Sequence, residues 1–322
     1  MSVLVYTENW DGKFKKLSYE LLSYAKSVAT LVGGDVTALS IGSVDQDELS
    51  TLGNYGASLV LSADGAPSGL DNQVYTSIIA AAMEKTGASV LLMAHNNSGK
   101  ALAPRLSVRL KAGLAAGVTA VPESAGPLLV SKKVFSGKAF GKVEILTEKA
   151  ILTLSQNSSE INETGGTASV ETFDPGVDTS AAATTIKDVQ KQEGKLLLTD
   201  ADVVISGGRG MKSGDNWGPL EELAEVLEGA TACSRPVSDE GWRPHNEHTG
   251  QTGKIIAPNL YLAFGISGAI QHLAGVSSSK CIVAVNTDKD APIFEAADYG
   301  IIGDALKVLP ELISEIKAAK AQ

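Results

Sequence analysis

A glycine-rich segment over residues 205–214 is the first part of the sequence whose residue types could bind a ligand. It follows an apolar run, 203–206, that predicts a buried strand, and it precedes a helix predicted over 220–227. A turn of this kind lets backbone N–H groups approach a phosphate. Gly208 and Gly210 match the start of a dinucleotide fingerprint, but Ser213 stands at the third glycine position. A connection that needs glycine only for its turn is the alternative.

The next predicted strand, 231–234, ends in Ser234-Arg235, whereas an NAD site would carry an acidic residue in this region. This argues against NAD and leaves open an NADP site in which Arg235 holds the 2′-phosphate. The sequence has no GxxxxGK[ST] segment, so a P-loop is excluded, and it has no GxSxG elbow for a serine nucleophile.

Two further segments carry polar groups at positions suited to a ligand. The loop from Thr249 to Lys254 reads Thr-Gly-Gln-Thr-Gly-Lys and presents amide and hydroxyl donors, although a plain surface loop is the alternative. A helix predicted over 267–273 follows a buried strand, so its N-terminus would be an anion site at the carboxyl edge of a parallel sheet. His272 lies one turn into that helix, where a purely structural histidine is the alternative.

Metal binding is not predicted. His245 and His248 are three residues apart, but they follow Pro244 in a loop and do not form HExxH. The two cysteines, Cys233 and Cys281, are isolated, which excludes a disulfide scaffold and fits a reducing compartment.

The elements that position these residues predict an α/β protein. Apolar strands alternate with helices over residues 2–121 and again from 196 onward, which is typical of mainly parallel, Rossmann-like sheets flanked by helices. Short β runs at 128–135, 141–147 and 150–155 predict an antiparallel extension of the first sheet. In the second half of the chain, 254–256 is a further predicted strand, and Asp304 caps a last helical region that restarts at Pro310. We therefore expect an N-terminal domain, 1–190, that ends in a Ser/Thr/Glu-rich linker arm over 156–184 with one strand at 168–173, and a C-terminal ligand-binding domain, 191–322.

Composition narrows the classes of partner. The net charge of −10 and the pI of about 5.0 argue against nucleic acid and anionic membranes. No apolar run approaches the roughly 20 residues that span a bilayer, so membrane insertion is not expected. The N-terminal residues have no basic region or long apolar stretch of a signal peptide, and we expect a cytoplasmic protein.

Together these segments resemble the α subunit of the electron transfer flavoproteins, of the bacterial type. The resemblance rests on 208–214, 234–236, 249–254, 265–272 and 291–300, and it is dense over 196–320. It implies one FAD per chain, bound non-covalently because no Cys or His lies in a flavin-attachment pattern. It also implies a heterodimer in which the first domain binds a β subunit, with AMP as a possible ligand of that subunit. Flavin dehydrogenases would donate the electrons, and a membrane quinone oxidoreductase or similar protein would accept them, without substrate turnover by this chain.

The resemblance also implies roles for individual residues. Arg235 would lie over the flavin ring, His272 at its C2 carbonyl, and Thr252 at N5 with Gln251 beside it. The rest of the FAD cradle would be Arg209, Ser234, Thr249, Gly250, Ser267, Gly268, Ala269, Ile270 and Gln271, and the adenosine end would lie at Asn286, Asp304 and Ala305.

The chemistry of these residue types supports that expectation. A cation and a donor beside the C2 carbonyl stabilise the negative charge of a reduced flavin. One full charge about 5 Å away, at an effective dielectric of about 20, contributes roughly 3 kcal/mol, on the order of 100 mV for one electron. Two classes remain as alternatives: an NADP-dependent oxidoreductase and a pure interaction protein, which flavin absorption would separate from an electron carrier.

Overall fold

The computed structural model describes residues 2–64, 69–137, 139–178, 180, 182, 184, 186–188 and 196–321. The chain divides into two compact units, Met1–Gln190 and Lys191–Gln322, which we describe separately. The last residues of the predicted linker arm lie in part outside the described residues. No helix in the described ranges combines the length and apolar character that a membrane span requires.

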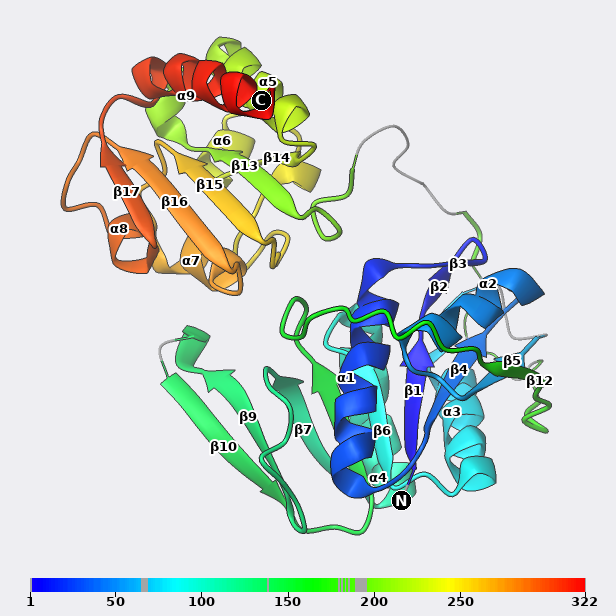
Figure 1. Ribbon diagram of the computed structural model, residues 1–322. Coiled ribbons are helices and arrows are strands. Elements are labelled where there is room, and N and C mark those ends of the chain that lie inside the picture. The colour runs from blue at the N-terminus through cyan, green and yellow to red at the C-terminus, as the bar shows by residue number, and fades with distance from the viewer. Residues whose placement is uncertain are drawn as a thin grey trace. The chain divides into compact units, whose positions relative to one another are not determined.

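The first unit is built on one large sheet, in the order β10-β9-β7-β11-β6-β1-β4-β5-β12 (Figure 1). Its parallel strands are β1 (Val3–Thr7), β4 (Val36–Ile41), β5 (Leu59–Ala63), β6 (Val90–Ala94), β7 (Gly113–Val118), β11 (Ala150–Leu154) and β12 (Ser169–Thr172). Two short strands, β2 (Asn9–Trp10) and β3 (Lys13–Phe14), form a separate hairpin. The parallel core confirms the predicted fold class.

Helices cover both faces of this sheet. They are α1 (Lys16–Val32), α2 (Gln46–Thr51), α3 (Asn72–Thr86) and α4 (Asn97–Leu110). Successive side chains of a strand point to opposite faces, so Val3 and Val5 pack in the core under α1, while Leu4 and Tyr6 pack under α3 and α4. All five residues of β1 are buried, as expected for a strand covered on both sides.

The antiparallel extension consists of β9 (Leu128–Val134) and β10 (Ala139–Ile145), with the short β8 (Ser124–Ala125) beside β9. This confirms the prediction for the first two runs, 128–135 and 141–147. The prediction for 150–155 is wrong, because β11 lies inside the sheet and pairs in parallel with β6 and β7. All five residues of β11 are buried, as is typical of a central strand that is covered on both faces.

The predicted arm is anchored more firmly over 156–173 than its composition indicates, and the strand expected within it at 168–173 is confirmed as β12. The Glu20 carboxylate of α1 accepts hydrogen bonds from the backbone N–H groups of Asn157, Ser158 and Ser159, at 2.9, 2.7 and 3.0 Å. Further along, β12 adds to the edge of the sheet beside β5, and Phe173 is buried. Hydrogen bonds to the backbone therefore anchor this segment. Its low apolar content gives no sign of them, because apolar content indicates only hydrophobic packing.

The second unit is a five-stranded, fully parallel sheet in the order β14-β13-β15-β16-β17. Its strands are β13 (Val203–Gly207), β14 (Ala230–Cys233), β15 (Leu260–Phe264), β16 (Cys281–Asn286) and β17 (Tyr299–Ile302). Helices α5 (Gly218–Val226) and α9 (Ala305–Lys320) cover one face, and α7 (Ile270–Val276) and α8 (Ile293–Ala296) cover the other (Figure 1). The short α6 (Arg235–Asp239) follows β14. This is the predicted Rossmann-like arrangement.

Three local predictions in this unit need correction. Residues 254–256 form no strand; the backbone there makes only an isolated bridge between Thr249 and Lys254. The helix expected from Ser267 begins at Ile270. The last helix does not restart at Pro310 but runs through it, because Leu309 and Ile313 bury the same face of α9 and packing outweighs the lost hydrogen bond.

Candidate functional site

A cavity of about 600 Å³ lies at the carboxyl edge of the second sheet. Its walls include residues that follow β13, β14 and β15, together with Asn286 at the end of β16. The chain passes from β13 outward to β14 and then returns to the other side of β13 as β15. The cavity therefore lies where strand order reverses, the place where open parallel sheets bind ligands.

The loops after β13 and β15 interlock through glycine. A Cβ atom at Gly210 would lie 2.5 Å from the Cα of Gly265, and Gly265 itself has a φ of +61°. The Gly208 N–H donates to the Phe264 carbonyl at 2.9 Å, and the Gly210 N–H donates to the Gly265 carbonyl at 3.0 Å. The prediction that these glycines expose N–H groups to a phosphate is therefore wrong at 208 and 210, where both groups hold the two loops together.

The loop at 249–254 forms a second wall. The Thr249 N–H donates to the Cys233 carbonyl at 3.0 Å, and the Gln251 N–H donates to the Gln271 carbonyl at 2.7 Å. Gly250 approaches α7 so closely that a Cβ atom on Gly275 would lie 2.4 Å from its Cα. These backbone contacts hold Gln251 and Thr252 at the cavity.

Arg235 supplies a cation at the rim of the cavity. Its Nη1 donates to the Thr252 hydroxyl at 3.1 Å, and its Nε lies 3.3 Å from the Asp239 carboxylate one turn along α6. The Arg235 side chain is 62% exposed. Asp239 also lines the cavity, so the guanidinium is positioned by two contacts and remains accessible from the pocket.

His272 forms part of the inner wall and is buried. Its Nε2 lies 2.7 Å from the Tyr261 hydroxyl, whereas its Nδ1 has no hydrogen-bond partner among the described residues. Burial lowers the pKa of His272 to about 4, the Thr249 backbone opposes this shift, and His248 adds to it. The ring is neutral at pH 7, so His272 does not place a second full charge at the site.

The structure brings most of the predicted site residues together. Twelve of them line the cavity: Arg209, Ser234, Arg235, Thr249, Gly250, Gln251, Thr252, Ser267, Ala269, Gln271, His272 and Asn286.

Four predicted residues are not part of this wall. Gly268 packs against the start of α8, where a Cβ atom would meet the backbone nitrogen of Ile293 at 2.3 Å, and Ile270 is half exposed. Asp304 caps α9 by accepting from the Leu306 N–H and pairs with Lys212 at 2.9 Å. Ala305 is the first residue of α9 and is buried in the core between that helix and the sheet.

Sequence reasoning missed six residues of the wall, namely Gly210, Pro236, Asp239, His248, Gly265 and Ile266. Four of the six are direct sequence neighbours of a predicted site residue, and this adjacency is the signal that could have identified them. Asp239 lies one helical turn after Arg235. His248 was considered only as a metal ligand; its ring lies 5.4 Å from that of His245, and the described residues contain no group of three potential metal ligands.

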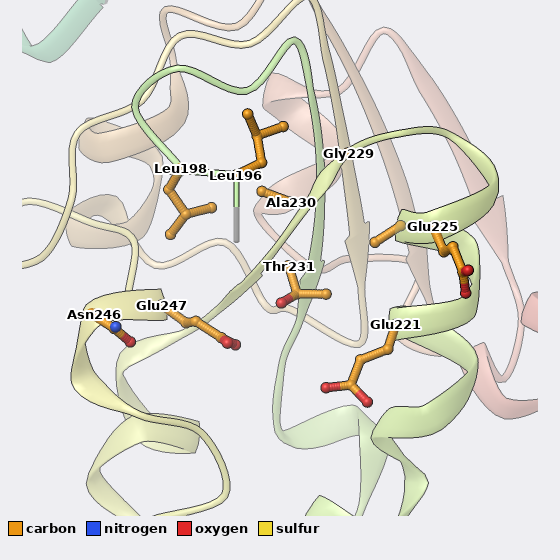
Figure 2. A pocket seen from close by; sticks show the side chains of 10 residues that line it. Leu196, Leu198, Glu221, Glu225, Gly229, Ala230, Thr231, Asn246 and Glu247 are labelled. Carbon is orange, nitrogen blue, oxygen red and sulfur yellow. The ribbon is translucent and has the colours of Figure 1, made fainter. Parts of the chain in front are cut away.

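A second cavity, of about 490 Å³, lies elsewhere on the same domain, at the N-terminal end of β14 (Figure 2). Carboxylates of Glu221 and Glu225 on α5 and of Glu247 line it. Arg243 binds Glu221 at 2.8 Å and Glu247 at 2.7 Å, so two of these carboxylates already have partners. An acidic lining repels phosphate groups, and the cavity at the carboxyl edge is therefore the better site for an anionic cofactor.

Comparison with known proteins identifies both halves of the chain. The electron transfer flavoprotein domain matches residues 3–178, and the electron transfer flavoprotein FAD-binding domain matches residues 197–277. The second match contains all of the cavity wall except Asn286.

Full-length relatives agree with these matches. The chain is 38% identical to the electron transfer flavoprotein subunit alpha of Syntrophomonas wolfei, over 97% of this chain and 98% of the relative. It is 36% identical to the protein of the same name from Bacillus subtilis, over 98% of this chain and 97% of the relative. It is 34% identical to the protein FixB of Clostridium saccharobutylicum, over 98% of this chain and 96% of the relative. The chain therefore belongs to the α-subunit family of the electron transfer flavoproteins, which are FAD-containing electron carriers and not enzymes with a substrate of their own.

Proposed function

We propose that this chain binds one FAD non-covalently in the cavity at the carboxyl edge of the second sheet, pairs with a β subunit, and carries electrons from flavin dehydrogenases to an acceptor such as a membrane quinone oxidoreductase. The observation that carries the proposal is the convergence of Arg235, Thr252 and His272, from three separate segments, on one cavity inside the FAD-binding domain.

The chemistry of the wall fits the cofactor. A flavin presents a flat ring with carbonyl acceptors, and FAD adds a pyrophosphate. Small residues such as Ser267 and Ala269 leave room at the cavity, and the guanidinium groups of Arg209 and Arg235 offer positive charge. The buried His272 Nδ1 has no hydrogen-bond partner among the described residues, as expected of a polar atom whose partner is supplied by a bound ligand.

FAD supplies the redox chemistry when bound, and the chain supplies binding and electrostatics. Arg235 holds a positive charge at the rim, fixed by Thr252 and Asp239, and this charge favours reduction of a ring beside it. His272 offers a neutral polar contact from the inner wall. The backbone N–H of Gln251, bonded to the Gln271 carbonyl of α7, holds the Gln251 segment at the cavity.

The partner proposal is supported by the first unit. Phe135 and Phe140, at the turn of the hairpin that joins β9 and β10, are 80% and 72% exposed. Large apolar side chains exposed together are typical of a surface that another protein covers. We propose that the β subunit, with or without AMP, binds this hairpin.

The first test is to co-express the chain with a β subunit of the same family and measure flavin absorption per α chain. We expect one FAD per chain, and acid precipitation should release the colour into the supernatant. Colour that stays with the precipitate would contradict non-covalent binding. A colourless protein that binds NADP with Arg235-dependent affinity would favour the oxidoreductase alternative.

A further inference from the structure

Helix α4 of the first unit has an exposed side whose charged residues are all basic. The helix spans Asn97–Leu110, and Lys111 caps its C-terminal end. Lys100, Arg105, Arg109 and Lys111 are exposed, and no acidic residue occurs between positions 97 and 111. The whole chain contains more acidic than basic residues, 37 against 27, so this basic face of α4 departs from the average of the chain.

The spacing of the residues places the four cations on one side of the helix. Positions 100, 104, 108 and 111 form a row along the helix, and Arg105 and Arg109 border this row. Val108, within the row, is 82% exposed, and Pro104 is exposed as well. The row is about 16 Å long, at a rise of 1.5 Å per residue. The other side of α4 packs into the core through Leu102, Leu106 and Leu110.

The described part of the chain does not neutralise the basic face. Arg109 Nη1 donates to the Ser77 hydroxyl of α3 at 3.1 Å, which is a contact with an uncharged group. None of the ion pairs among the described residues includes Lys100, Arg105, Arg109 or Lys111. Four positive charges are therefore available to a partner.

Helix stability does not account for this arrangement. Lys100 is the fourth residue of α4, and a cation near the N-terminus of a helix opposes the helix dipole. Arg105 and Arg109 are four residues apart, a spacing at which like charges repel each other. The helix dipole favours only the cations at the C-terminal end, Arg109 and Lys111. Lys100 and Arg105 therefore gain nothing from the helix that carries them.

We propose that the basic face of α4 is the docking surface for a redox partner protein whose own surface is acidic, with an apolar side chain against Val108. Complementary charges guide association and orient the two proteins. Complexes of electron carriers are among those that bury little surface, so a short charged face is sufficient. The net charge of −10 repels an acidic protein from the rest of the chain and restricts its approach to α4. The proposal rests on the proposed function only in naming the partner as a redox protein.

An anionic membrane is a poorer occupant of the same face. Val108 and Pro104 are the only apolar residues in the row, and they offer little apolar surface for insertion between lipids. A membrane also presents its negative charge to a large part of the protein, where the net charge of the chain opposes binding.

The test is binding of a fluorescently labelled decaglutamate peptide to the heterodimer, measured by fluorescence anisotropy. The wild-type protein should bind the peptide, and the affinity should fall as salt is added, because salt screens exposed charges. Arg105→Glu should weaken binding about three- to tenfold, since it replaces an attraction by a repulsion. The same variant should unfold at a urea concentration no lower than the wild type, because the carboxylate introduced at 105 lies four residues before Arg109 and attracts it.

Lys26→Glu is the matched control, because it makes the same change of charge at an exposed position of α1 in the same unit. It should bind the peptide nearly as tightly as the wild type. Equal losses in both variants would overturn the proposal, since net charge alone would then decide binding. A wild-type protein that does not bind the peptide would also overturn it. So would tighter, Arg105-dependent binding to vesicles of phosphatidylserine and phosphatidylcholine, which would place a membrane on α4.

A second measurement tests the redox character of the partner. The second-order rate of electron exchange with at least one protein that reduces or oxidises the bound flavin should be lower in Arg105→Glu than in Lys26→Glu. Equal rates with every such protein would overturn the proposal and leave the electron-carrier function intact. Conversely, a chain without flavin would refute FAD binding, whereas its affinity for the peptide would still report on the basic face of α4.

Discussion

The Arg235 guanidinium donates to the Thr252 hydroxyl, with Nη1 and Oγ1 3.1 Å apart. The two residues come from different segments: Arg235 begins α6, and Thr252 lies in the loop that is fixed on α7. Because backbone hydrogen bonds hold the Thr252 loop in place, the Thr252 hydroxyl in turn fixes the position of the Arg235 guanidinium. Asp239 opposes part of that charge from 3.3 Å.

Arg235→Ala should lower the potential at which the bound flavin takes up its first electron. A charge about 5 Å away contributes between about 1 and 3 kcal/mol as the effective dielectric falls from about 80 to 20. Because the side chain is 62% exposed, solvent screening favours the lower end, a shift of a few tens of mV. Spectroscopic redox titration of the loaded heterodimer measures this shift.

Asp239→Asn provides the complementary variant, since loss of the carboxylate should raise the same potential. Lys317→Ala, on the exposed side of α9, removes a cation from the same domain outside the cavity and serves as the control. Equal potentials in Arg235→Ala and Lys317→Ala would show that Arg235 does not act on the flavin.

The sequence predicted the features that depend on local pattern. Buried strands such as β1 and β15 are short apolar runs bounded by turns, and polar residues that directly follow such strands meet at one edge of the sheet. The position of Arg235 and Ser267 at the cavity follows from that rule.

Contacts between distant segments were not predictable in the same way. The run 150–154 reads as any short apolar strand, and only its pairing with β6 and β7 makes it central. The bond between Tyr261 and His272 joins two residues whose spacing carries no periodic signal. From the sequence, Glu20 would be assigned to the exposed face of α1. Its three backbone donors, the N–H groups of residues 157–159, are over 130 positions away in the chain and cannot be inferred from local pattern.

Gly210→Ala should destabilise the second domain and reduce its FAD content. The added Cβ would lie 2.5 Å from the Cα of Gly265, a backbone clash that no side-chain rotation can relieve. Overpacking of this kind costs about 1–3 kcal/mol, to be measured by urea unfolding. Gly218→Ala is the matched control, because no heavy atom lies within 4 Å of its added Cβ. Similar unfolding midpoints for both variants would contradict the interlock of the two loops.

Acidification should weaken the first domain through His95. Burial, with help from Lys100 and Lys132, lowers the pKa of this half-buried histidine from 6.5 to about 4. Between these values the unfolded chain takes up a proton that the folded chain does not, so the free energy of unfolding falls as the pH decreases from about 6.5 to 4. Above that window His95 contributes no pH dependence.

His95→Gln removes this titration while its amide can still reach the Thr153 hydroxyl, which now lies 2.8 Å from Nδ1. With allowance for partial exposure, we expect the acid-induced loss of stability to shrink by up to about 1 kcal/mol at pH 5. Urea unfolding at pH 7 and pH 5 measures the difference. An identical loss in wild-type protein and variant would show that His95 is protonated equally in both states.

Phe140→Ser should weaken binding of the β subunit without weakening the fold. The Phe140 side chain is 72% exposed, so its removal leaves no cavity in the core of the isolated chain, whereas a partner that buries the ring would lose its contact. We expect the dissociation constant of the heterodimer to rise about tenfold, the equivalent of about 1.4 kcal/mol, in a calorimetric titration. Val108→Ser, which removes an 82% exposed apolar side chain from α4, should bind like the wild-type chain. Unchanged affinity for Phe140→Ser would place the β subunit on another surface.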